Sequence, residues 1–291
     1  MNRFCLGTVQ FGLKYGISNK IGKPKKKQVK DIIRFAVDNN IDLFDTAQSY
    51  GNSEQLLGEI FNELGVQNDI KVISKLSPNF KINEVHVQIN KSLDNLMIDS
   101  LWGLLLHRYE PSLINNKLRE LIINSKKENK ILNFGVSIYN PSDAIEALNE
   151  SLFDIIQVPF NILDRRLIDN KFFEIAKEKN KKVFIRSIYL QGLLLMSNSD
   201  LKNKNMDWAI PMLSELHEYS KLYKIELKSF ASTAINNYVS DCYLITGVDS
   251  LNQLKENLQM LNECKYSNEV FKNWWKDLKL YPEKLLNPSL W

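Results

Sequence analysis

The sequence predicts a (β/α)8 barrel, and three observations support that fold. Short apolar runs rich in β-branched or aromatic residues alternate with longer stretches of helical periodicity along the chain. Eight such pairs occur, which favours a closed barrel of parallel strands over an open doubly wound sheet. The length of 291 residues and the apolar content of 44% suit one large core. We therefore expect a single barrel domain over residues 1–291.

The eight strand candidates are apolar runs of the kind found in buried parallel sheets. In order they are FCLGTVQ (4–10), DLFDT (42–46), IKVISKL (70–76), SLWGLLLH (100–107), ILNFGVS (131–137), FDIIQVPF (153–160), KVFIRSI (182–188) and CYLITGV (242–248). Because helix candidates separate them, each strand is expected to pair in parallel with the next through a right-handed crossover.

Helix candidates with one apolar face connect these strands, at 28–39, 53–64, 82–96, 112–128, 141–150, 168–179, 207–224 and 251–262. In the second helix, Ser53 is expected to be the N-cap, and Glu54 is expected to be a structural acid near the positive helix terminus. In the last helix, Ser250 and Gln253 form a capping-box pattern ahead of a leucine stripe.

The final crossover and the C-terminal segment depart from the regular pattern. A further helix candidate at 228–238 lengthens the connection before the last strand. Residues 265–291 contain three tryptophans and are expected to form an additional helix and a tail packed on the barrel. An oligomer contact is the alternative for this segment, since exposed tryptophan is costly unless it is covered. The oligomeric state is left open.

Composition argues against several classes of protein. No apolar run reaches the roughly 18 residues that cross a bilayer, and no signal-peptide pattern opens the chain, so we expect a cytoplasmic protein. Cys5, Cys242 and Cys264 have no paired spacing, which predicts reduced thiols rather than disulfides or a zinc site. The net charge of +4 is mild, and the basic run at 23–30 is expected to be a solvated approach to a helix. No nucleic-acid partner is predicted.

Four polar residues lie at the ends of consecutive strand candidates: Asp45, Lys75, His107 and Ser137. Taken singly, each has a structural alternative, such as a turn cap, a solvated strand end or a histidine satisfied at the edge of the core. Active sites of this fold gather at the C-terminal ends of the strands. Because all four residues would meet at that rim, together they favour one functional site.

A tyrosine close to this rim suggests the chemistry. Tyr50 follows Asp45 by five positions in DLFDTAQSYGNSEQLLG (42–58). A phenol has a pKa near 10 and is a poor acid or base at neutral pH unless a neighbouring cation stabilises its phenolate. Lys75 could supply the cation, Asp45 could hold it, and His107 could donate a hydrogen bond to a substrate oxygen. Such a set suits the reduction of ketones or aldehydes.

The motifs around these residues resemble those of the aldo-keto reductases over nearly the whole chain. LGTVQFG (6–12), DTAQSYGNSEQLLG (45–58), SK (74–75) and LLLH (104–107) follow in the order and spacing of that family. The resemblance implies a catalytic tetrad of Asp45, Tyr50, Lys75 and His107. In it Tyr50 is the general acid, Lys75 with Asp45 tunes it, and His107 orients the carbonyl. A nicotinamide cofactor bound across the barrel mouth would supply the hydride.

The same resemblance implies a set of cofactor-binding residues: Gly7, Thr8, Asp45, Ser137, Gln157, Arg186, Ser187, Tyr189, Gln191, Gly247, Ser250, Gln253 and Asn257. Ser137 and Gln157 would bind the carboxamide, the loop from Ser187 would hold the pyrophosphate, and residues 247–257 would hold the adenosine. Three positions depart from the family pattern. Ile138 replaces a common asparagine, Arg186 replaces a ring-stacking aromatic, and Gln253 replaces an arginine that many NADP-preferring members use for the 2'-phosphate. NADPH is the family default and the expected cofactor, but the absence of this arginine weakens that expectation and leaves NADH open.

The substrate is expected to be a small-molecule carbonyl compound held between loops 108–116 and 189–208. The apolar residues of the second loop either line this pocket or pack in the core: Leu193, Leu194, Leu195, Met196 and Trp208. The opening LGTVQFGLKYGI resembles a branch of the family associated with bacterial surface polysaccharides. That resemblance implies a keto-sugar substrate. If the sugar is linked to a nucleotide, its phosphate would contact Lys25 to Lys27 or Arg108.

Two other functions stay open. A cofactor-binding regulatory subunit with this fold would turn over slowly, which the complete tetrad disfavours. A metal-dependent barrel enzyme would need His and carboxylate ligands at strand ends. The chain has three histidines, His86, His107 and His217, and two of them fall within helix candidates, so no metal is expected.

Overall fold

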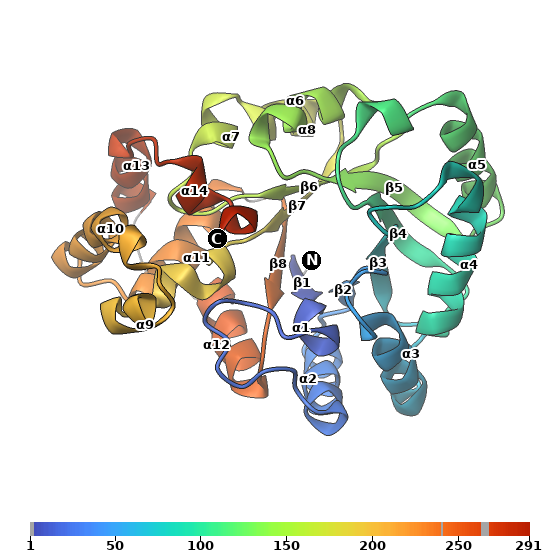
Figure 1. Cartoon of the computed structure of the whole chain (residues 1–291), viewed down its shortest axis with the longest axis horizontal. Coiled ribbons are helices and arrows are strands. Elements are labelled where there is room, and N and C mark those ends of the chain that lie inside the picture. The colour runs from blue at the N-terminus through green and yellow to red at the C-terminus, as the bar shows by residue number, and fades with distance from the viewer. Residues whose placement is uncertain (1–2, 240, 263–267) are drawn as a thin grey trace.

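The computed structural model of this chain describes residues 3–239, 241–262 and 268–291. Eight parallel strands close into a barrel in which each strand pairs with its neighbours in the chain and the first pairs with the eighth. Figure 1 shows helices arranged around these strands. The predicted (β/α)8 barrel is confirmed.

The strands are β1 (Phe4–Gly7), β2 (Leu43–Asp45), β3 (Lys71–Lys75), β4 (Leu101–Leu106), β5 (Ile131–Ser137), β6 (Ile155–Pro159), β7 (Lys182–Arg186) and β8 (Tyr243–Gly247). All eight fall within the predicted runs, although β1 is much shorter than its run. The chain turns after Gly7 into the short helix α1 (Val9–Gly12), whose Phe11 is buried. Residues 8–10 therefore leave the sheet, because helix α1 is the element that places the side chain of Phe11 in the core.

The larger helices of the outer ring are α2 (Lys26–Asp38), α3 (Ser53–Leu64), α4 (Val85–Leu96), α5 (Asn116–Lys127), α6 (Pro141–Asn149), α8 (Phe172–Glu178), α10 (Ile210–Leu222), α11 (Leu227–Tyr238) and α12 (Leu251–Asn262). The helix predicted at 168–179 is instead two, because Lys171 adopts a left-handed φ of 54° between α7 (Arg166–Asp169) and α8. Helix α9 (Asn198–Asn203) was not predicted; its N-cap Ser197 accepts a hydrogen bond from the Asp200 amide.

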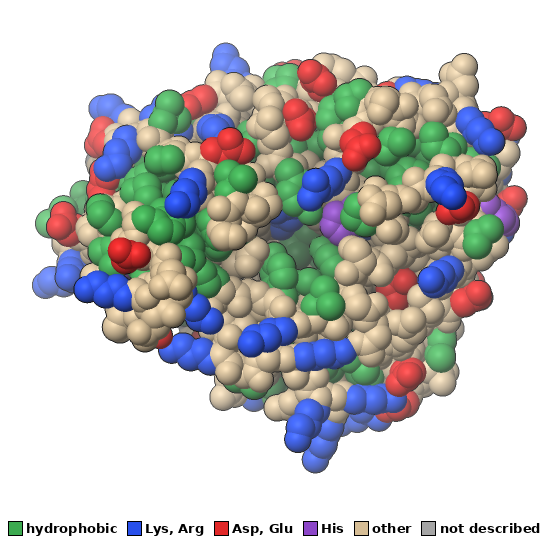
Figure 2. Space-filling view, viewed as in Figure 1, with side chains coloured by type: hydrophobic (Ala, Val, Ile, Leu, Met, Phe, Trp, Pro, Cys, Tyr) green, Lys and Arg blue, Asp and Glu red, His purple; other side chains and the backbone are tan. Residues whose placement is uncertain are grey.

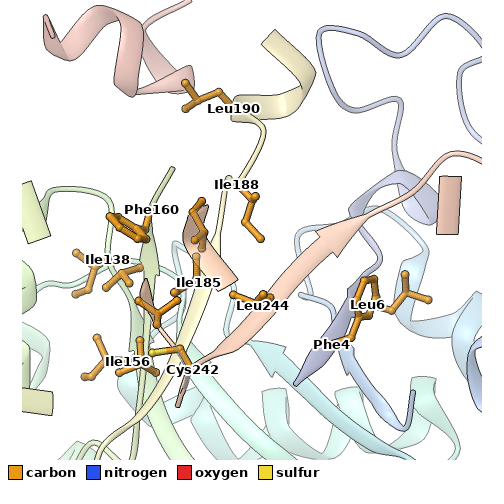
Figure 3. Close-up of a cluster of buried hydrophobic side chains, with 14 of the residues drawn as sticks. Phe4, Leu6, Ile138, Ile156, Phe160, Ile185, Ile188, Leu190, Cys242 and Leu244 are labelled. Carbon is orange, nitrogen blue, oxygen red and sulfur yellow. The ribbon is translucent and has the colours of Figure 1, made fainter. Parts of the chain in front are cut away.

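Two layers of apolar side chains hold the barrel together. The inner cluster fills the barrel with one residue from each of seven strands: Cys5, Leu43, Ile73, Leu105, Ile155, Phe184 and Ile245. The larger cluster lies between the strands and the helices. Figure 3 shows part of it, including Ile156, Ile185 and Leu244 of three strands and Phe160, which follows β6. Alternate residues along each strand thus face the two layers, as expected for strands buried on both faces.

The C-terminal segment continues beyond α12 as α13 (Asn268–Asp277), α14 (Glu283–Leu286) and the 3-10 turn η5 (Pro288–Leu290). Trp274 and Trp275 are buried, and Trp274 Nε1 donates to the Ile162 carbonyl at 2.8 Å. These two tryptophans are therefore covered by the chain itself, and they give no reason to expect an oligomer contact.

The basic run at 23–30 makes ion pairs within the chain. Lys26 pairs with Glu59 and Glu63, and Lys30 pairs with Glu63, so the start of α2 is tied to α3. Cys5 and Cys242 are buried free thiols, while Cys264 lies outside the described residues. Within the described ranges, no helix is both long and apolar enough to cross a membrane.

The start of α3 differs from its prediction, because Ser53 is not the N-cap. Asn52 precedes the helix, and Ser53 is buried in the first turn. The Ser53 hydroxyl donates to the Thr8 carbonyl at 3.0 Å and lies 3.1 Å from the Thr46 hydroxyl. A serine that looks like a helix cap in the sequence thus joins the ends of β1 and β2 to α3.

Candidate active site

Strand alternation decides which side chains meet at the barrel mouth. Residues two positions apart in a strand lie on the same face of the sheet. Seven of the predicted site residues lie two positions after a residue of the inner cluster: Gly7, Asp45, Lys75, His107, Gln157, Arg186 and Gly247. They therefore share the inner face of the barrel at the C-terminal ends of the strands, one layer beyond the packed interior.

Asp45 and Lys75 form a buried ion pair. Lys75 Nζ lies 2.7 Å from each carboxylate oxygen of Asp45 and 3.0 Å from the Thr46 carbonyl oxygen. Gln157 Nε2 donates to Asp45 Oδ1 at 2.7 Å, and Ser137 pairs in register with Gln157. An ammonium group has three N–H donors, so all those of Lys75 are used by these oxygens. Asp45 is thus the centre of a hydrogen-bonded group that spans three strands.

Tyr50 is held beside this group by close backbone packing. Its carbonyl accepts from the Ser53 amide at 3.0 Å, and its ring centroid lies 5.0 Å from Lys75 Nζ. A Cβ added to Gly12 would lie 1.7 Å from the Tyr50 carbonyl oxygen, so only glycine fits there. The position of the phenol is therefore set jointly by α1 and by the turn before α3.

The pKa of the Tyr50 phenol is higher than the sequence suggests. Burial, followed by the charge of Asp45, raises the pKa of Tyr50 well above 10. We expected Lys75 to offset this rise, but the hydrogen bonds of its ammonium go to Asp45 and Thr46. Tyr50 is accordingly protonated at neutral pH and can act as an acid.

His107 lies at the edge of the same group. Its ring packs edge-on against the Tyr50 ring at a centroid distance of 6.0 Å, and its Nδ1 lies 3.3 Å from Ser49 Oγ. Burial and the charges of Lys75 and Arg186 lower the pKa of His107 to about 3. The imidazole is therefore neutral at pH 7 and has one N–H to donate.

A cavity of about 650 Å³ opens beside this group; of the four predicted catalytic residues, Asp45 and Tyr50 are in its described lining, whereas Lys75 and His107 are not. Figure 2 shows a hollow near the middle of this face, with basic side chains and a histidine at its rim. Asp45, Tyr50 and every predicted cofactor-binding residue except Ser250 line the cavity. The volume is in the range typical of small-molecule and cofactor sites. Ser250 is instead an anchor of α12, since its Oγ accepts from the Gln253 amide at 3.3 Å.

The loop after β7 has an unusual backbone. Ser187, Leu190 and Gln191 have φ of 63°, 46° and 55°, and Gly192 has φ of 92°. Left-handed conformations at residues other than glycine are unfavourable and cluster at functional sites. Turns of this kind can direct successive backbone N–H groups to one point and so form an anion site. The loop predicted to hold the pyrophosphate is suited to an anion.

Two buried polar atoms that line the cavity bear on whether a dinucleotide fits there. Gln10 Oε1 and Thr246 Oγ1 are buried and have no hydrogen-bond partner among the described residues. Buried polar groups are normally hydrogen-bonded, so these atoms are suited to a ligand that carries amide and hydroxyl groups. The residues present fit the nicotinamide cofactor that the sequence implies.

The far end of the cavity is acidic. Gln253 Oε1 accepts from the Asp249 amide at 2.7 Å, so this side chain is engaged with the backbone. Asp249 lines the cavity, and burial raises the pKa of its carboxyl group. Glu256 also lines it and is paired with Lys228 at 2.7 Å. The part of the cavity predicted to bind adenosine thus contains two carboxylates, and Lys228 beside them is already paired with Glu256.

Several predicted substrate contacts lie elsewhere. Leu193, Leu194 and Met196 are buried in the core, whereas Leu195 lines the cavity. Trp208 lines a second hollow of about 710 Å³, described below. Arg108 lines the main cavity, but Lys25 to Lys27 are absent from its described lining. Leu193, Leu194 and Met196 therefore pack in the core rather than form a wall for the substrate.

Other lining residues were missed from the sequence. Tyr15, Tyr139 and the C-terminal residues 286–289 all line the cavity. Tyr139 follows the end of β5 by two positions, so the strand-end rule could have found it. Tyr15 and the tail come from a loop and a terminal segment, for which that rule has no signal.

Glu54 is structural, as expected, but its role differs from that of a solvated helix-start acid. Its side chain is 3% exposed and accepts from Ser74 Oγ at 2.6 Å and from Asn95 Nδ2 at 3.1 Å. The carboxylate thus fastens α3 to β3 and α4, below the active-site group. Among the described residues, no group of three or more His, Cys, Asp or Glu side chains is placed to hold a metal ion.

Comparison with known proteins identifies relatives of this arrangement. A sequence profile described as the aldo/keto reductase family matches residues 3–276. D-arabinose 1-dehydrogenase of Saccharomyces cerevisiae is 24% identical over 262 residues, covering 80% of this chain and 76% of that protein. The NADH-specific methylglyoxal reductase of Escherichia coli is 23% identical over 265 residues, covering 76% and 79%. Aldo-keto reductase AKR11C1 from Bacillus halodurans, solved in its holo form, superposes with a TM-score of 0.76 at 20% identity over 96% of this chain and 93% of that one.

Proposed function

Because the chain belongs to the aldo/keto reductase family, whose members are NAD(P)H-dependent oxidoreductases, we propose that it reduces a ketone or aldehyde with Tyr50 as the general acid. The observation that carries this proposal is the buried Asp45 and Lys75 pair beside a protonated phenol at the mouth of the cavity. A group of this kind can deliver a proton to a carbonyl oxygen that becomes an alkoxide.

Each member of the group has a separate part in the proposed reaction. A nicotinamide cofactor, when bound, would supply the hydride for the carbonyl carbon. Tyr50 donates its proton to the carbonyl oxygen. Arg186 opposes the rise in the pKa of Tyr50, and Lys75, 5.0 Å from the ring, can act on the remaining phenolate through its charge but not through a hydrogen bond. Asp45 keeps Lys75 in place through two hydrogen bonds. The neutral imidazole of His107 orients the carbonyl with its N–H.

The proposed cofactor contacts follow the predicted order along the cavity. Gly7, Thr8, Ser137 and Gln157 would surround the nicotinamide, the backbone of the 187–192 loop would bind the pyrophosphate, and Gly247, Gln253 and Asn257 would hold the adenosine. These residues line one continuous cavity, and the loop has the backbone of an anion site. Ser250 acts only indirectly in this proposal, by anchoring α12.

We propose a keto-sugar as the substrate. More specifically, we propose that this sugar is linked to a nucleotide and that the reaction takes place in the cytoplasm. A relative named for a sugar, D-arabinose 1-dehydrogenase, is consistent with this class. The second hollow adjoins the main cavity through Tyr15 and Gln191, which line both. Its lining includes three lysines and three aromatic residues: Lys14, Lys204, Lys284, Tyr15, Trp208 and Trp291. Aromatic faces and ammonium groups suit a base and its phosphates.

Cofactor titration combined with turnover tests this proposal. Nicotinamide fluorescence would give the Kd of NADPH and NADH, and turnover would be measured on aldehydes and nucleotide-linked keto-sugars. We expect Tyr50→Phe to bind cofactor normally and to lose about 10²- to 10⁴-fold in kcat, the usual contribution of a general acid. Tyr223→Phe, which makes the same change outside the described cavity lining, is the control.

The outcomes separate the alternatives. Full activity of Tyr50→Phe would show that the assigned acid is wrong. Cofactor binding without turnover of any carbonyl compound by the unaltered protein would favour a regulatory subunit. Turnover of small aldehydes alone would contradict the keto-sugar.

A further inference from the structure

Two positively charged groups lie against the ring of Tyr139 at the rim of the active-site cavity. The guanidinium carbon of Arg186 lies 4.5 Å from the centroid of the Tyr139 ring, and that of Arg108 lies 5.2 Å from it. The His107 ring is stacked against the same tyrosine at 6.5 Å and 19°. All three basic residues thus gather on one aromatic ring next to Tyr50.

The two arginines have no carboxylate partner in the part of the chain that the structure describes. Among the described residues, no carboxylate lies within ion-pair distance of either guanidinium. Asp45, which lines the same end of the cavity, is already bound to Lys75. Two guanidinium groups beside one ring repel each other, and a shared anion would relieve that repulsion.

The positive charge reaches the catalytic group. Arg186 and Arg108 both contribute to lowering the pKa of His107, after burial and Lys75. Arg186 also opposes the rise in the pKa of Tyr50 and of Tyr15. An anion bound between the arginines would therefore lie close to the carbonyl that His107 and Tyr50 receive.

Stacking leaves the edges of the guanidinium groups available for hydrogen bonds. Arg186 donates to the Ile138 carbonyl at 2.8 Å and to Ser187 Oγ at 3.2 Å, which uses two of its five N–H groups. Arg108 is exposed at the rim, where its contact with Tyr139 orients the planar group. A planar guanidinium held in this way suits a carboxylate or phosphate, which it can bind through two parallel hydrogen bonds.

We infer that Arg108 and Arg186, held on Tyr139, form a binding site for an anionic group of the substrate, a carboxylate or a phosphate a few bonds from the reacting carbonyl. The inference rests on the proposed reductase function and specifies which carbonyl compounds it favours. Charge at the rim would also raise the rate of encounter with such substrates at low salt. Arg186 precedes the loop proposed for the pyrophosphate, so Arg108 is the residue whose variants separate substrate binding from cofactor binding.

Matched pairs of substrates test this inference on the full-length protein. The first pair is 4-carboxybenzaldehyde and its neutral methyl ester, and the second is glyceraldehyde 3-phosphate and glyceraldehyde. For the unaltered protein we expect kcat/KM to be about tenfold or more higher for the charged member of at least one pair, as for a charge-assisted hydrogen bond. The pair that shows the preference tells carboxylate from phosphate. The preference should fall as salt is raised, because the arginine at the rim is exposed.

Variants of Arg108 provide the second readout. Arg108→Gln should lower the ratio of charged to neutral kcat/KM about tenfold, mainly through KM, and Arg108→Lys should keep part of it. Arg34→Gln, the same change at an exposed position of α2, should leave the ratio unchanged. Equal reduction of charged and neutral members, or an unchanged ratio in Arg108→Gln, would overturn the inference while the reductase function stood. Failure to reduce any carbonyl compound, ketone or aldehyde, charged or neutral, would instead overturn the proposed function on which the inference rests.

Discussion

Lys75 Nζ lies 2.7 Å from both carboxylate oxygens of Asp45, and the two side chains are only 1% and 6% exposed. Together with the Thr46 carbonyl, Asp45 accepts every hydrogen bond that the ammonium can donate. A second pair, Lys71 with Asp42, joins the other ends of the same two strands but is 38% and 43% exposed. The chain thus holds a buried and an exposed ion pair between one pair of strands.

This contrast makes a stability prediction. Asp45→Asn would leave the Lys75 charge buried without a counter-ion, and we expect a loss of about 3 to 5 kcal/mol in the free energy of unfolding. Asp42→Asn should cost less than about 1 kcal/mol, because exposed pairs are screened. Urea denaturation of both variants measures the difference. The double variant Asp45→Asn with Lys75→Met should recover part of the loss, and equal effects at the two pairs would argue against a tightly buried charge.

Glu54 should prove important for stability and unimportant for catalysis. Glu54→Leu would leave the Ser74 hydroxyl and the Asn95 amide without their acceptor in a buried site. At about 1 to 3 kcal/mol for each of the two unsatisfied groups, we expect a loss of roughly 2 to 6 kcal/mol. Glu54→Gln keeps one acceptor oxygen and should lose less. Thermal unfolding and the Kd of the cofactor are the measurements, and a fall in turnover at unchanged stability would contradict a structural role.

His107 should make the protein sensitive to acid. Its pKa in the folded state is about 3, below the ordinary value of 6.5, so the unfolded chain takes up a proton that the folded chain does not. Stability is therefore lost as the pH falls from about 6.5 towards 3. Between pH 7 and pH 5 this single group should contribute a loss of up to about 2 kcal/mol. Urea midpoints at both pH values should differ less for His107→Gln than for the unaltered protein, and equal differences would show that other groups cause the acid sensitivity.

The acidic end of the cavity bears on the choice of cofactor. If the 2'-phosphate of NADPH lies near Asp249, as the predicted adenosine site implies, the carboxylate repels it. Asp249→Asn should tighten NADPH binding about fivefold, equivalent to about 1 kcal/mol, with little change for NADH. Fluorescence titration of both cofactors gives the ratio. Asp69→Asn, at an exposed position away from the described cavity lining, is the control, and an equal gain for NADH would show that the 2'-phosphate is not involved.

The sequence predicts well where the proposed catalytic residues lie, because their positions obey local rules. Asp45, Lys75 and His107 each lie two positions beyond an inner-cluster residue of their own strand. In a (β/α)8 barrel the order of strands in space is their order in the chain, so residues at successive strand ends must be neighbours. A periodicity of two and a count of eight are therefore sufficient to bring these side chains together.

Other features depend on contacts that no local pattern encodes. Ser53 has the composition and position of a helix cap, but its hydroxyl is recruited by Thr8, 45 residues earlier. Trp274 finds a partner in Ile162, 112 residues away, which is why its burial could not be predicted from the chain alone. The interruption between α7 and α8 comes from the left-handed backbone of Lys171, which the periodicity of apolar residues does not reveal.

The C-terminal residues 286–289 line the cavity and yet form no part of a strand. Residues of the barrel cannot change without disturbing a close-packed layer, whereas in this segment only Leu286 is buried in the core, and Asn287, Pro288 and Ser289 are half-buried or exposed. New substrate preferences could therefore arise, in natural descent or in the laboratory, by replacing residues 287–289 while the proposed proton-delivering group is inherited unchanged. Exchanging the C-terminal segment between relatives of this fold would give a series of enzymes that share one barrel and differ in the substrates they accept.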